Sequence, residues 1–364
     1  MKTILFLDHT PLVGGAQIVL LNYVKYLDKR KFKVVVVCSG ESEYLVSEFK
    51  KYANKVYVIK FGKLKVFSLK SVLNFLKSTL EIKKIAKQEH IDILAANTER
   101  AFYSAAIVTL LNRKKLILFI RDYLYNKTIL KILTTRTTKI FVVSKELQRF
   151  YSLGKNSEVL YPGTDMKIRL DRVEEGEVEE IRAKYGLQGK TVVGFVGRLV
   201  NWKGAHVLVE AAKKLDRKDV VYLIVGEFDP SNPTYQAELL KSQSQNVIFT
   251  GFTPKPELYY RFMDVYVHTS IEKEPYALGI IEAMGAKVPV IATNLGGSTE
   301  LITDGRNGLL IEPDDSSQLA DALTSLLDNP DLRGKIGETG FDSVIQKNDI
   351  MQEVKYLESV FKVL

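Results

Sequence analysis

Cysteine is almost absent: the chain of 364 residues has one, Cys38, so no disulfide can form within it. Cys38 ends the apolar run VVVVC, which predicts a buried strand and an unreactive thiol. We therefore expect a reducing compartment, the cytoplasm. Long apolar runs are absent as well. The N-terminal ILFL has only four apolar residues before Asp8, so we expect neither a signal peptide nor a membrane span there.

Motifs for metals and for Walker-type phosphate binding are also missing. The sequence has no Asp-x-Asp triplet to hold a divalent ion against a diphosphate, and no GxxxxGKS or GxxxxGKT run. Its four histidines lack the spacing of metal ligands: His9, His90, His206 and His268. We expect that the protein needs no metal and no cofactor.

The surplus of positive over negative charge lies entirely in the first half of the chain. Residues 1–165 hold 29 Lys and Arg against 13 Asp and Glu, a net charge of +16, whereas residues 166–364 hold 23 against 30, a net charge of −7. Such a surplus is typical of a surface that attracts a lipid headgroup layer, a polyphosphorylated acceptor or nucleic acid. A lysine-rich solvated surface explains it equally well. We expect that the protein does not bind nucleic acid, because no interleaving of aromatic and basic residues is visible.

The length fits roughly two domains of about 150 residues each. Short apolar runs alternate with helical patterns, which predicts an α/β protein with parallel sheets covered on both faces. The predicted strands are residues 2–8, 33–38, 56–59, 91–95, 116–120 and 140–143 in the first half, and 191–197, 220–225, 247–249, 265–268 and 288–292 in the second. From Ser316 onward the chain is expected to be helical, with a break near Asn329.

Polar loops follow three strands of the first half, and ligands bind beyond the carboxyl ends of parallel strands. They contain His9, the residues Asn97 to Arg100, and Arg121 beside Asp122. Each arginine is a candidate for a substrate contact, or for capping a helix or pairing with Asp122. A glycine pair, Gly14 and Gly15, joins the first strand to its helix. It allows a backbone to approach a ligand closely, although GG is also a common turn.

The segment from Lys63 to Lys87 mixes lysines with apolar residues at helical spacing. We expect the apolar stripe to pack on the sheet and the lysines to face water. The alternative is a basic amphipathic helix on a membrane surface, with residues 61–67, FGKLKVF, as the insertion point. The apolar residues of the stripe are Leu69, Val72, Leu73, Leu76, Leu80 and Ile85.

The stretch from His268 to Pro313 holds the most specific pattern. Two glutamates, Glu272 and Glu274, lie in the loop after a buried strand, and a helix is expected to begin close to Ala277, just after Pro275. The open N-terminus of this helix offers unpaired amides, those of Leu278 and Gly279, to a phosphate. Glu282 lies about 6 Å further along the helix, which suits a carboxylate that binds both hydroxyls of the attached ribose.

The loop after the strand 191–197 reads GRLVNWKG and places Arg198 and Lys203 five residues apart. Two cations that leave a buried strand suit a diphosphate, because arginine offers a fork of N–H donors and lysine a point charge. An exposed loop with ordinary surface charges is the alternative.

The string EPYALGIIEAM, with Glu274 and Glu282 eight positions apart, is followed by PVIA, GGSTELI and DGRNGLL. Together with GRLVNWKG, these strings resemble the donor-site signature of retaining glycosyltransferases of family 4, and the likeness covers nearly the whole chain. The resemblance implies the GT-B fold: two Rossmann-like domains facing each other across a cleft, with the last helix crossing back. The expected boundaries are residues 1–165 for the acceptor domain, 173–347 for the nucleotide-sugar donor domain and 348–364 for the returning helix.

The resemblance also implies roles for single residues. Arg198 and Lys203 would neutralise the charge that grows on the leaving diphosphate, and Glu274 would hold sugar hydroxyls. These three are the expected catalytic residues. In this mechanism the departing phosphate helps to remove the acceptor's proton, so no protein nucleophile is required. The residues expected to bind the donor are Gly14, Gly15, Ala277, Leu278, Gly279 and Glu282, and the candidate acceptor or sugar contacts are His9, Asn97, Arg100 and Arg121.

The sequence departs from the family pattern at two positions. Ala277 stands where the family often has glycine, and Asn97 stands where many members have the second histidine of a His-x-His pair. Asn97 can hydrogen-bond a sugar hydroxyl but cannot titrate, so it cannot give acid–base help.

We therefore expect a cytoplasmic glycosyltransferase of the hexosyltransferase class, in contact with an anionic membrane. Its donor would be a UDP-sugar and its acceptor a saccharide or lipid-linked saccharide, as in the assembly of surface polysaccharide. The alternatives are a non-catalytic subunit of this fold that binds membrane or polyanion, and a nucleotide-sugar epimerase. A glycoside hydrolase with paired carboxylates would leave the phosphate-type motifs unexplained.

Overall fold

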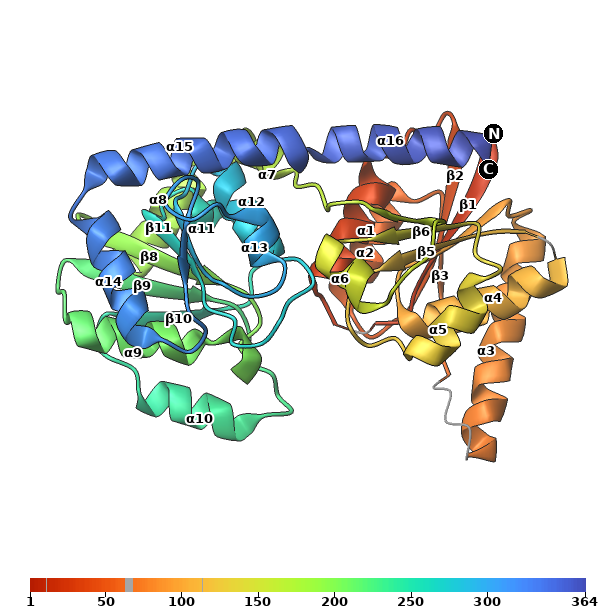
Figure 1. Cartoon of the computed structure of the whole chain (residues 1–364), viewed down its shortest axis with the longest axis horizontal. Coiled ribbons are helices and arrows are strands. Elements are labelled where there is room, and N and C mark those ends of the chain that lie inside the picture. The colour runs from red at the N-terminus through yellow and green to blue at the C-terminus, as the bar shows by residue number, and fades with distance from the viewer. Residues whose placement is uncertain (11, 63–67, 113) are drawn as a thin grey trace. The chain divides into compact units, whose positions relative to one another are not determined.

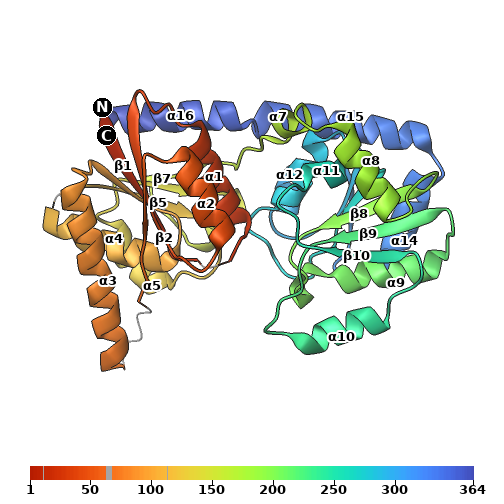
Figure 2. The ribbon, with the colours of Figure 1, turned by 180° about the vertical axis from the view of Figure 1, so that it is seen from behind.

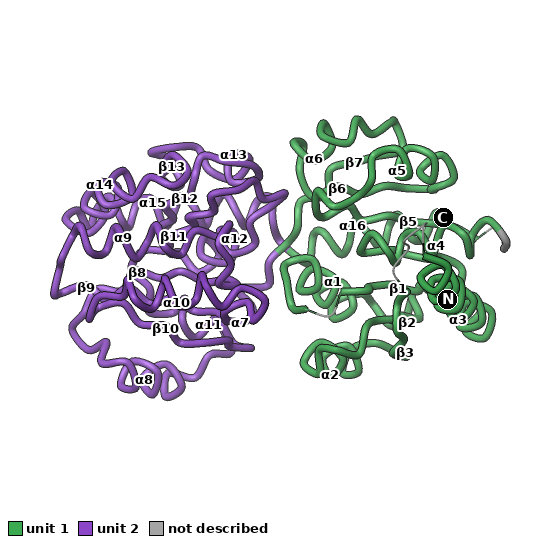
Figure 3. Tube along the Cα trace, turned by 90° about the horizontal axis from the view of Figure 1, so that it is seen from below, with its two compact units in different colours: residues 1–163, 350–364 green, residues 164–349 purple. Residues whose placement is uncertain are grey.

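The computed structural model describes residues 1–10, 12–62, 68–112 and 114–364 (Figure 1). It divides into two compact units (Figure 3). Unit 1 comprises Met1–Gly163 and Ile350–Leu364, and unit 2 comprises Thr164–Asp349. The predicted insertion point at residues 61–67 falls largely on residues 63–67, outside the described residues.

Unit 1 is built on a parallel sheet of seven strands in the order β3-β2-β1-β4-β5-β6-β7. Its central strands are continuous apolar runs and are buried on both faces, as expected when helices cover both faces of a parallel sheet. The strands are β1 (Lys2–Asp8), β2 (Phe32–Cys38), β3 (Lys55–Val58), β4 (Ile93–Ala96), β5 (Lys115–Ile120), β6 (Lys139–Val142) and β7 (Ser157–Val159). The helices are α1 (Gly15–Tyr26), α2 (Glu43–Tyr52), α3 (Leu69–Gln88), α4 (Glu99–Asn112), α5 (Lys127–Thr134), α6 (Lys145–Phe150) and α16 (Ile350–Val363).

Unit 2 repeats this architecture with a parallel sheet of six strands in the order β10-β9-β8-β11-β12-β13. The strands are β8 (Thr191–Val196), β9 (Val220–Val225), β10 (Val247–Gly251), β11 (Val265–His268), β12 (Val290–Thr293) and β13 (Leu309–Ile311). The helices are α7 (Met166–Leu170), α8 (Glu175–Lys184), the 3-10 turn η1 (Asn201–Lys203), α9 (Ala205–Leu215), α10 (Pro233–Lys241), α11 (Glu257–Tyr260), α12 (Leu278–Gly285), α13 (Ser298–Leu301), α14 (Ser316–Leu327) and α15 (Pro330–Lys347).

The predicted α/β class with two parallel sheets is confirmed, and every predicted strand is present within a few residues of its expected bounds. Two strands, β7 and β13, were not predicted from the sequence. Each has three residues and closes one edge of its sheet, where a strand needs only half of the ladder and little apolar surface. Among the described residues, none of the helices combines the length and the apolar character that crossing a membrane requires.

The expectation for α3 was wrong in one respect. Ile85 packs inward as expected, but four leucines of the same stripe remain exposed, namely Leu69, Leu73, Leu76 and Leu80. The inward face of α3 is supplied instead by Phe75, Ser78, Thr79 and Ile82. The sequence pattern contains two apolar stripes on one helix, and only one of them reaches the core of unit 1.

The last helix, α16, is part of unit 1 (Figures 1 and 2). Phe361 packs edge-on against Phe6 and Phe32, with ring centroids 6.4 and 6.0 Å apart. Glu353 lies on the buried face of α16. It accepts hydrogen bonds from the Tyr23 hydroxyl and, over 2.6 Å, from the Gly163 amide. The final helix is therefore fixed to unit 1 by aromatic packing and by one buried carboxylate.

Glu353 should make the stability of the protein pH-dependent. Burial raises the pKa of Glu353 to about 7, although the Tyr23 hydroxyl and the Gly163 amide oppose the shift. The folded state thus holds the proton more tightly than the unfolded chain, so stability is highest below the unfolded pKa and falls as the pH rises toward 7. A shift of this size corresponds to about 3 kcal/mol.

We expect the free energy of unfolding to fall by about 3 kcal/mol more in the wild type than in Glu353→Gln between pH 4.5 and pH 7.5, as measured by urea denaturation. Glu358→Gln, on the same helix, is the control and should follow the wild-type profile. Parallel profiles for the wild type and Glu353→Gln would show that this carboxyl does not carry the dependence.

Candidate active site

The Glu274 side chain is the centre of a buried polar cluster in unit 2. Its Oε1 atom lies 2.6 Å from Lys203 Nζ and 3.0 Å from His268 Nε2, and it also accepts a short hydrogen bond from the Ser270 hydroxyl. Only 7% of Glu274 is exposed to solvent. Three donors thus meet one carboxylate, as a buried charge requires.

A left-handed glycine brings Lys203 to this carboxylate. The GRLVNWKG loop leaves β8, forms the turn η1 and ends at Gly204, whose φ is 69°. A Cβ on Gly204 would lie 1.9 Å from the Thr269 carbonyl oxygen, so no other residue fits. The Thr269 hydroxyl donates to the Gly204 carbonyl over 2.8 Å, which fixes the loop against the end of β11.

A second glycine pair holds the other side of the Glu274 loop. Gly296 has a φ of 60°, and a Cβ there would lie 2.5 Å from the Glu274 carbonyl oxygen. The Gly297 amide donates to that same carbonyl over 2.8 Å. The GGSTE string therefore shapes the Glu274 backbone from one side while the GRLVNWKG loop supplies a cation from the other.

The electrostatics of this cluster favour an ionised carboxylate. Burial by itself would raise the pKa of Glu274, but the charges and hydrogen bonds of Lys203 and His268 outweigh it and hold the pKa well below its usual range. Glu274 is therefore a fixed anion near neutral pH, able to accept hydrogen bonds from hydroxyls but not to donate a proton.

His268 was missed as a site residue, because the four histidines show no metal-ligand spacing. Its neighbourhood in the sequence carried the signal, since it ends a buried strand six residues before Glu274. In the structure its Nδ1 atom lies 3.4 Å from the Tyr266 hydroxyl, and its Nε2 atom faces Glu274. His268 thus joins the carboxylate to the strand beneath it.

Helix α12 begins at Leu278, close to the predicted start, and no side chain caps its N-terminus. A Cβ on Gly279 would lie 2.1 Å from the Tyr266 hydroxyl oxygen, so glycine allows the first turn to sit tightly against β11. The Leu278 and Gly279 amides keep the open geometry that suits a phosphate. That they bind one stays a prediction.

Glu282 belongs to a second cluster, organised by an arginine that sequence reasoning missed. Arg169 Nη2 lies 2.7 Å from Glu282, Nη1 lies 2.9 Å from Glu257, and Nε lies 2.8 Å from Asp165. Burial raises the pKa of Glu282, and Arg169 opposes that shift. The carboxylate expected to hold a ribose is therefore paired with Arg169. This arginine lies on α7, in the short stretch between the two predicted domains, where no motif marked it.

Two tyrosines connect the clusters. The Tyr260 hydroxyl lies 3.4 Å from Glu282 Oε2, and the Tyr260 ring lies 5.7 Å from that of Tyr266, which in turn contacts His268. Glu274, Glu282, Gly279 and Lys203 thus share one network in unit 2. Arg198 lies in the same loop as Lys203, and its side chain is exposed. Two hydrogen bonds from Ser231 lower the pKa of Asp229, and the charge of Arg198 adds a smaller effect in the same direction.

The candidate acceptor residues lie in unit 1, where β1, β4 and β5 end. Asn97 donates to Asp8 over 2.6 Å and accepts from Arg121 Nε over 2.7 Å. The Arg121 guanidinium lies over the ring of Tyr23, and its Nη2 atom is buried with no hydrogen-bond partner among the described residues. Asn97 is buried, and both ends of its side-chain amide are hydrogen-bonded within unit 1. That it contacts a sugar stays a prediction.

His9 and the glycine pair also lie at this edge of unit 1. His9 Nδ1 lies 2.7 Å from the Thr98 hydroxyl, and burial together with the charge of Arg100 lowers the pKa of His9 to about 4. His9 is therefore neutral at physiological pH. Gly14 caps α1 in an extended conformation and Gly15 is exposed at its first residue, so the turn needs no positive φ. Arg100 is half-buried on α4.

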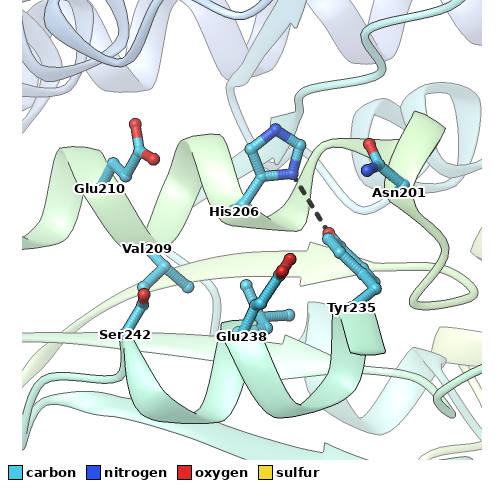
Figure 4. Close-up of a pocket in the computed structure, with 8 residues that line it drawn as sticks. Asn201, His206, Val209, Glu210, Tyr235, Glu238 and Ser242 are labelled. Atoms are coloured by element: carbon cyan, nitrogen blue, oxygen red, sulfur yellow. Dashed lines mark hydrogen bonds between the residues drawn. The ribbon is translucent and has the colours of Figure 1, made fainter. Parts of the chain in front are cut away.

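A separate cavity of about 260 Å³ lies between α9 and α10 (Figure 4). His206 and Tyr235 both line it and are joined by a 3.3 Å hydrogen bond. None of the predicted site residues lines this cavity. No group of three or more His, Cys, Asp and Glu among the described residues is arranged to hold a metal, and the expectation of a metal-independent reaction stays a prediction.

Replacement of Arg169 should destabilise unit 2. Arg169→Ala would leave Asp165, Glu257 and Glu282 close together without their cation, and breaking a buried ion pair from one side costs about 3 kcal/mol. We expect this loss in urea denaturation at pH 7, and a smaller loss at pH 5, where Glu282, whose pKa is raised by burial, more readily takes up a proton and the repulsion weakens. The exposed neighbour provides the control, since Arg172→Ala should change stability by less than about 0.5 kcal/mol. Equal losses in both variants would contradict the assignment.

Comparison with known proteins agrees with these observations. The family model described as "Glycosyl transferases group 1" matches residues 177–342, and the one described as "Glycosyltransferase Family 4" matches residues 13–167. Spore coat protein SA of Bacillus subtilis is 32% identical over 204 residues, which are 52% of this chain and about half, 54%, of that protein. The capsular polysaccharide biosynthesis glycosyltransferase CapM of Staphylococcus aureus is 24% identical over 374 residues, covering 97% of this chain and 96% of CapM.

Solved structures share the fold over the full length. Anabaena HepE, crystallised with UDP and glucose, has a TM-score of 0.87 at 24% identity, with 100% of both chains covered. Sucrose-phosphate synthase from Thermosynechococcus elongatus has a TM-score of 0.81 at 18% identity, covering 100% of this chain and 98% of that one. With two parallel Rossmann-like sheets and the family's motifs on the loops after β8 and β11, the chain belongs to the group 1 glycosyltransferases of family 4 and has the GT-B fold.

Proposed function

We propose that the protein transfers a sugar, with retention of configuration, from a UDP-sugar to a saccharide or a lipid-linked saccharide. The observation that carries the proposal is the single network of unit 2, in which a fixed anion, Glu274, lies beside Lys203 and the uncapped start of α12. A fold neighbour has been crystallised with UDP and with UDP-glucose, which supports UDP as the nucleotide.

In this mechanism the leaving diphosphate is received by positive charge. The Leu278 and Gly279 amides, Arg198 and Lys203 would share its oxygens, and the charge that develops there as the sugar bond breaks is stabilised by groups already in place. The Arg198 side chain is exposed and therefore accessible to a ligand. Lys203 already lies on Glu274, so a bound diphosphate would be held by a lysine that also fixes the carboxylate.

Glu274 and Glu282 have different tasks in the proposal. Glu274, ionised and held by three donors, would accept hydrogen bonds from sugar hydroxyls and orient the sugar over the leaving group. Glu282 would bind the ribose hydroxyls. Because Arg169 now occupies Oε1 of Glu282, the ribose would bind beside this ion pair or displace part of it.

We propose that unit 1 supplies the acceptor contacts. His9, neutral because of its lowered pKa, and Arg100 are the candidates at its edge. Asn97 and Arg121 would act as positioning residues, since they connect Asp8 to the aromatic rings below. We place the protein at the cytoplasmic face of a membrane, in contact with anionic lipid, in the assembly of a surface polysaccharide or glycoconjugate. The basic first half of the chain and the capsular relative support this placement.

Calorimetry with UDP, GDP and ADP tests the donor site. We expect saturable binding of UDP, weakened about 10- to 100-fold in Glu282→Ala, because hydrogen bonds to a charged group contribute about 1.5–3 kcal/mol. Lys213→Ala, an exposed lysine on α9, is the control and should bind UDP like the wild type. If no nucleotide binds, or if Glu282→Ala binds UDP unchanged, the donor site lies elsewhere and a non-catalytic subunit becomes the better explanation.

Turnover tests the role of the cations. With a UDP-sugar that binds, we expect Arg198→Ala and Lys203→Ala each to lower kcat by about 10²- to 10³-fold, as removal of one charge-stabilising donor does in other enzymes. Release of UDP measured by a coupled assay gives the rate, and the anomeric configuration of the product is read by NMR. A product of inverted configuration, or full activity in both variants, would refute this mechanism.

A further inference from the structure

Helix α3 carries an apolar stripe that faces solvent. Leu69, Leu73, Leu76 and Leu80 are 76%, 57%, 44% and 63% exposed. Their spacing of four, three and four residues places them on one side of the helix, one turn above another. Single exposed leucines are common on protein surfaces, but four in one line form a continuous patch that marks an interaction site.

This stripe does not serve the core of unit 1. Phe75, Thr79, Ile82 and Ala86 form the inward face of α3, roughly opposite the leucines, and they pack where the helix meets unit 1. Gly62 fits against this face, because its amide donates to the Ser78 hydroxyl over 3.2 Å and a Cβ would lie 2.4 Å from the Phe75 amide nitrogen. The helix is therefore held without the four leucines.

The patch is also the part of α3 that reaches furthest from the sheet. In Figures 1 and 2, the N-terminal end of α3 extends beyond α4 and α5. Three of the four leucines lie in this N-terminal half, between Leu69 and Leu76. They are accessible to a broad, flat partner without any movement of the other helices of unit 1.

The charges on α3 indicate the chemistry of that partner. The helix carries five lysines and a single acid, Glu81. At 100° per residue, Lys70, Lys77 and Lys84 lie along one edge of the leucine stripe, and Lys83 lies on the other. A second copy of this helix would bring ten lysines together around the shared leucines. An anionic surface would instead receive leucine side chains and lysine ammonium groups at the same time.

We propose that the leucine stripe of α3, consisting of Leu69, Leu73, Leu76 and Leu80, docks on an anionic lipid bilayer, with the flanking lysines bound to the headgroups. The inference rests on the membrane contact of the proposed function and assigns it to one surface. An amphipathic helix of this kind lies in the plane of the interface, where buried apolar area and the charge of the lipid both contribute to binding.

The position of α3 gives this contact a use. In a parallel sheet the crossover helix runs opposite to the strands, so its N-terminal end lies toward the edge where β1 and β4 end. Phe61, which precedes the helix, lies against His9, with ring centroids 6.3 Å apart. The docked stripe would thus hold the acceptor edge of unit 1 next to the bilayer, where the sugar of a lipid-linked acceptor is exposed.

Sedimentation with lipid vesicles tests the proposal on the full chain. The wild type should bind vesicles of phosphatidylcholine mixed with phosphatidylglycerol, and bind far less to phosphatidylcholine alone. Leu73→Ser with Leu76→Ser should lower the partition coefficient by about tenfold or more. Lys77→Gln with Lys84→Gln should lower it by about fivefold for each lysine, an effect that fades as salt rises.

Matched controls lie in unit 2. Leu240→Ser replaces a leucine that is 42% exposed on α10, and Lys213→Gln with Lys241→Gln removes two exposed lysines from α9 and α10. Neither should change vesicle binding. All the variants should keep the wild-type melting temperature and UDP affinity, because every substituted residue is exposed and none is a candidate site residue.

Three results would overturn the assignment. Vesicle binding that is absent, or that is unchanged in both α3 variants, rules out this surface. Loss of a dimer in Leu73→Ser with Leu76→Ser by analytical ultracentrifugation, without vesicle binding, would show that a second copy covers the stripe. UDP calorimetry separates this inference from the donor site: UDP binding without vesicle binding refutes only the docking surface, and vesicle binding through α3 without UDP binding refutes only the donor site.

Discussion

The structure of two loops of unit 2 depends on one buried carboxylate. Placing Glu274 where 7% of it is exposed costs several kcal/mol unless donors replace the lost water. Lys203, His268 and Ser270 replace it, the first from the loop after β8 and the other two from the end of β11 and the loop that follows it. Their convergence fixes the geometry of two loops. It explains why glycine stands at positions 204, 296 and 297, where a Cβ would collide with the carbonyl oxygens of Thr269, Glu274 and Pro275 respectively.

A different balance operates at Glu282. Three carboxylates share one arginine, so the cluster around Arg169 retains excess negative charge, and burial raises the pKa of Glu282 instead of lowering it. The pKa values of the two glutamates of one sequence motif are thus shifted in opposite directions. Several hydrogen-bond donors keep Glu274 ionised, whereas Glu282 has fewer donors than its buried carboxylate requires. An incoming pair of hydroxyls would relieve that shortage, which is consistent with the ribose-binding role proposed for Glu282.

Much of this arrangement could be predicted from the sequence, because it depends on local patterns. Buried parallel strands appear as continuous apolar runs, and the start of α12 follows from Pro275 and helical periodicity. Arg169 could not be found in this way, since its three partners are as many as 113 residues distant along the chain and no motif surrounds it. The contacts of Asn97 could not be predicted for the same reason: the sequence shows its residue type but not that its side chain bonds to Asp8 and Arg121.

The exposed leucines of α3 show a further limit of periodicity. A helical pattern reveals that apolar residues share a face, but it does not reveal which face meets the sheet when a helix has two such faces. In the structure, Phe75 and Ile82 lie on the buried face of α3, which packs against α4, and the four leucines are left outside.

The uneven charge of the two halves of the chain fits the proposed division between nucleotide binding by unit 2 and membrane contact by unit 1. A diphosphate is a compact anion, and at physiological salt fields are screened within about 8 Å, so the few cations at the site matter more than the net charge of −7 around it. A membrane is an extended anion, and there the contributions of many exposed lysines add. A surplus of +16 spread over the first half of the chain would be of little use for binding one nucleotide, but it suits the anionic surface that we propose as the partner of unit 1.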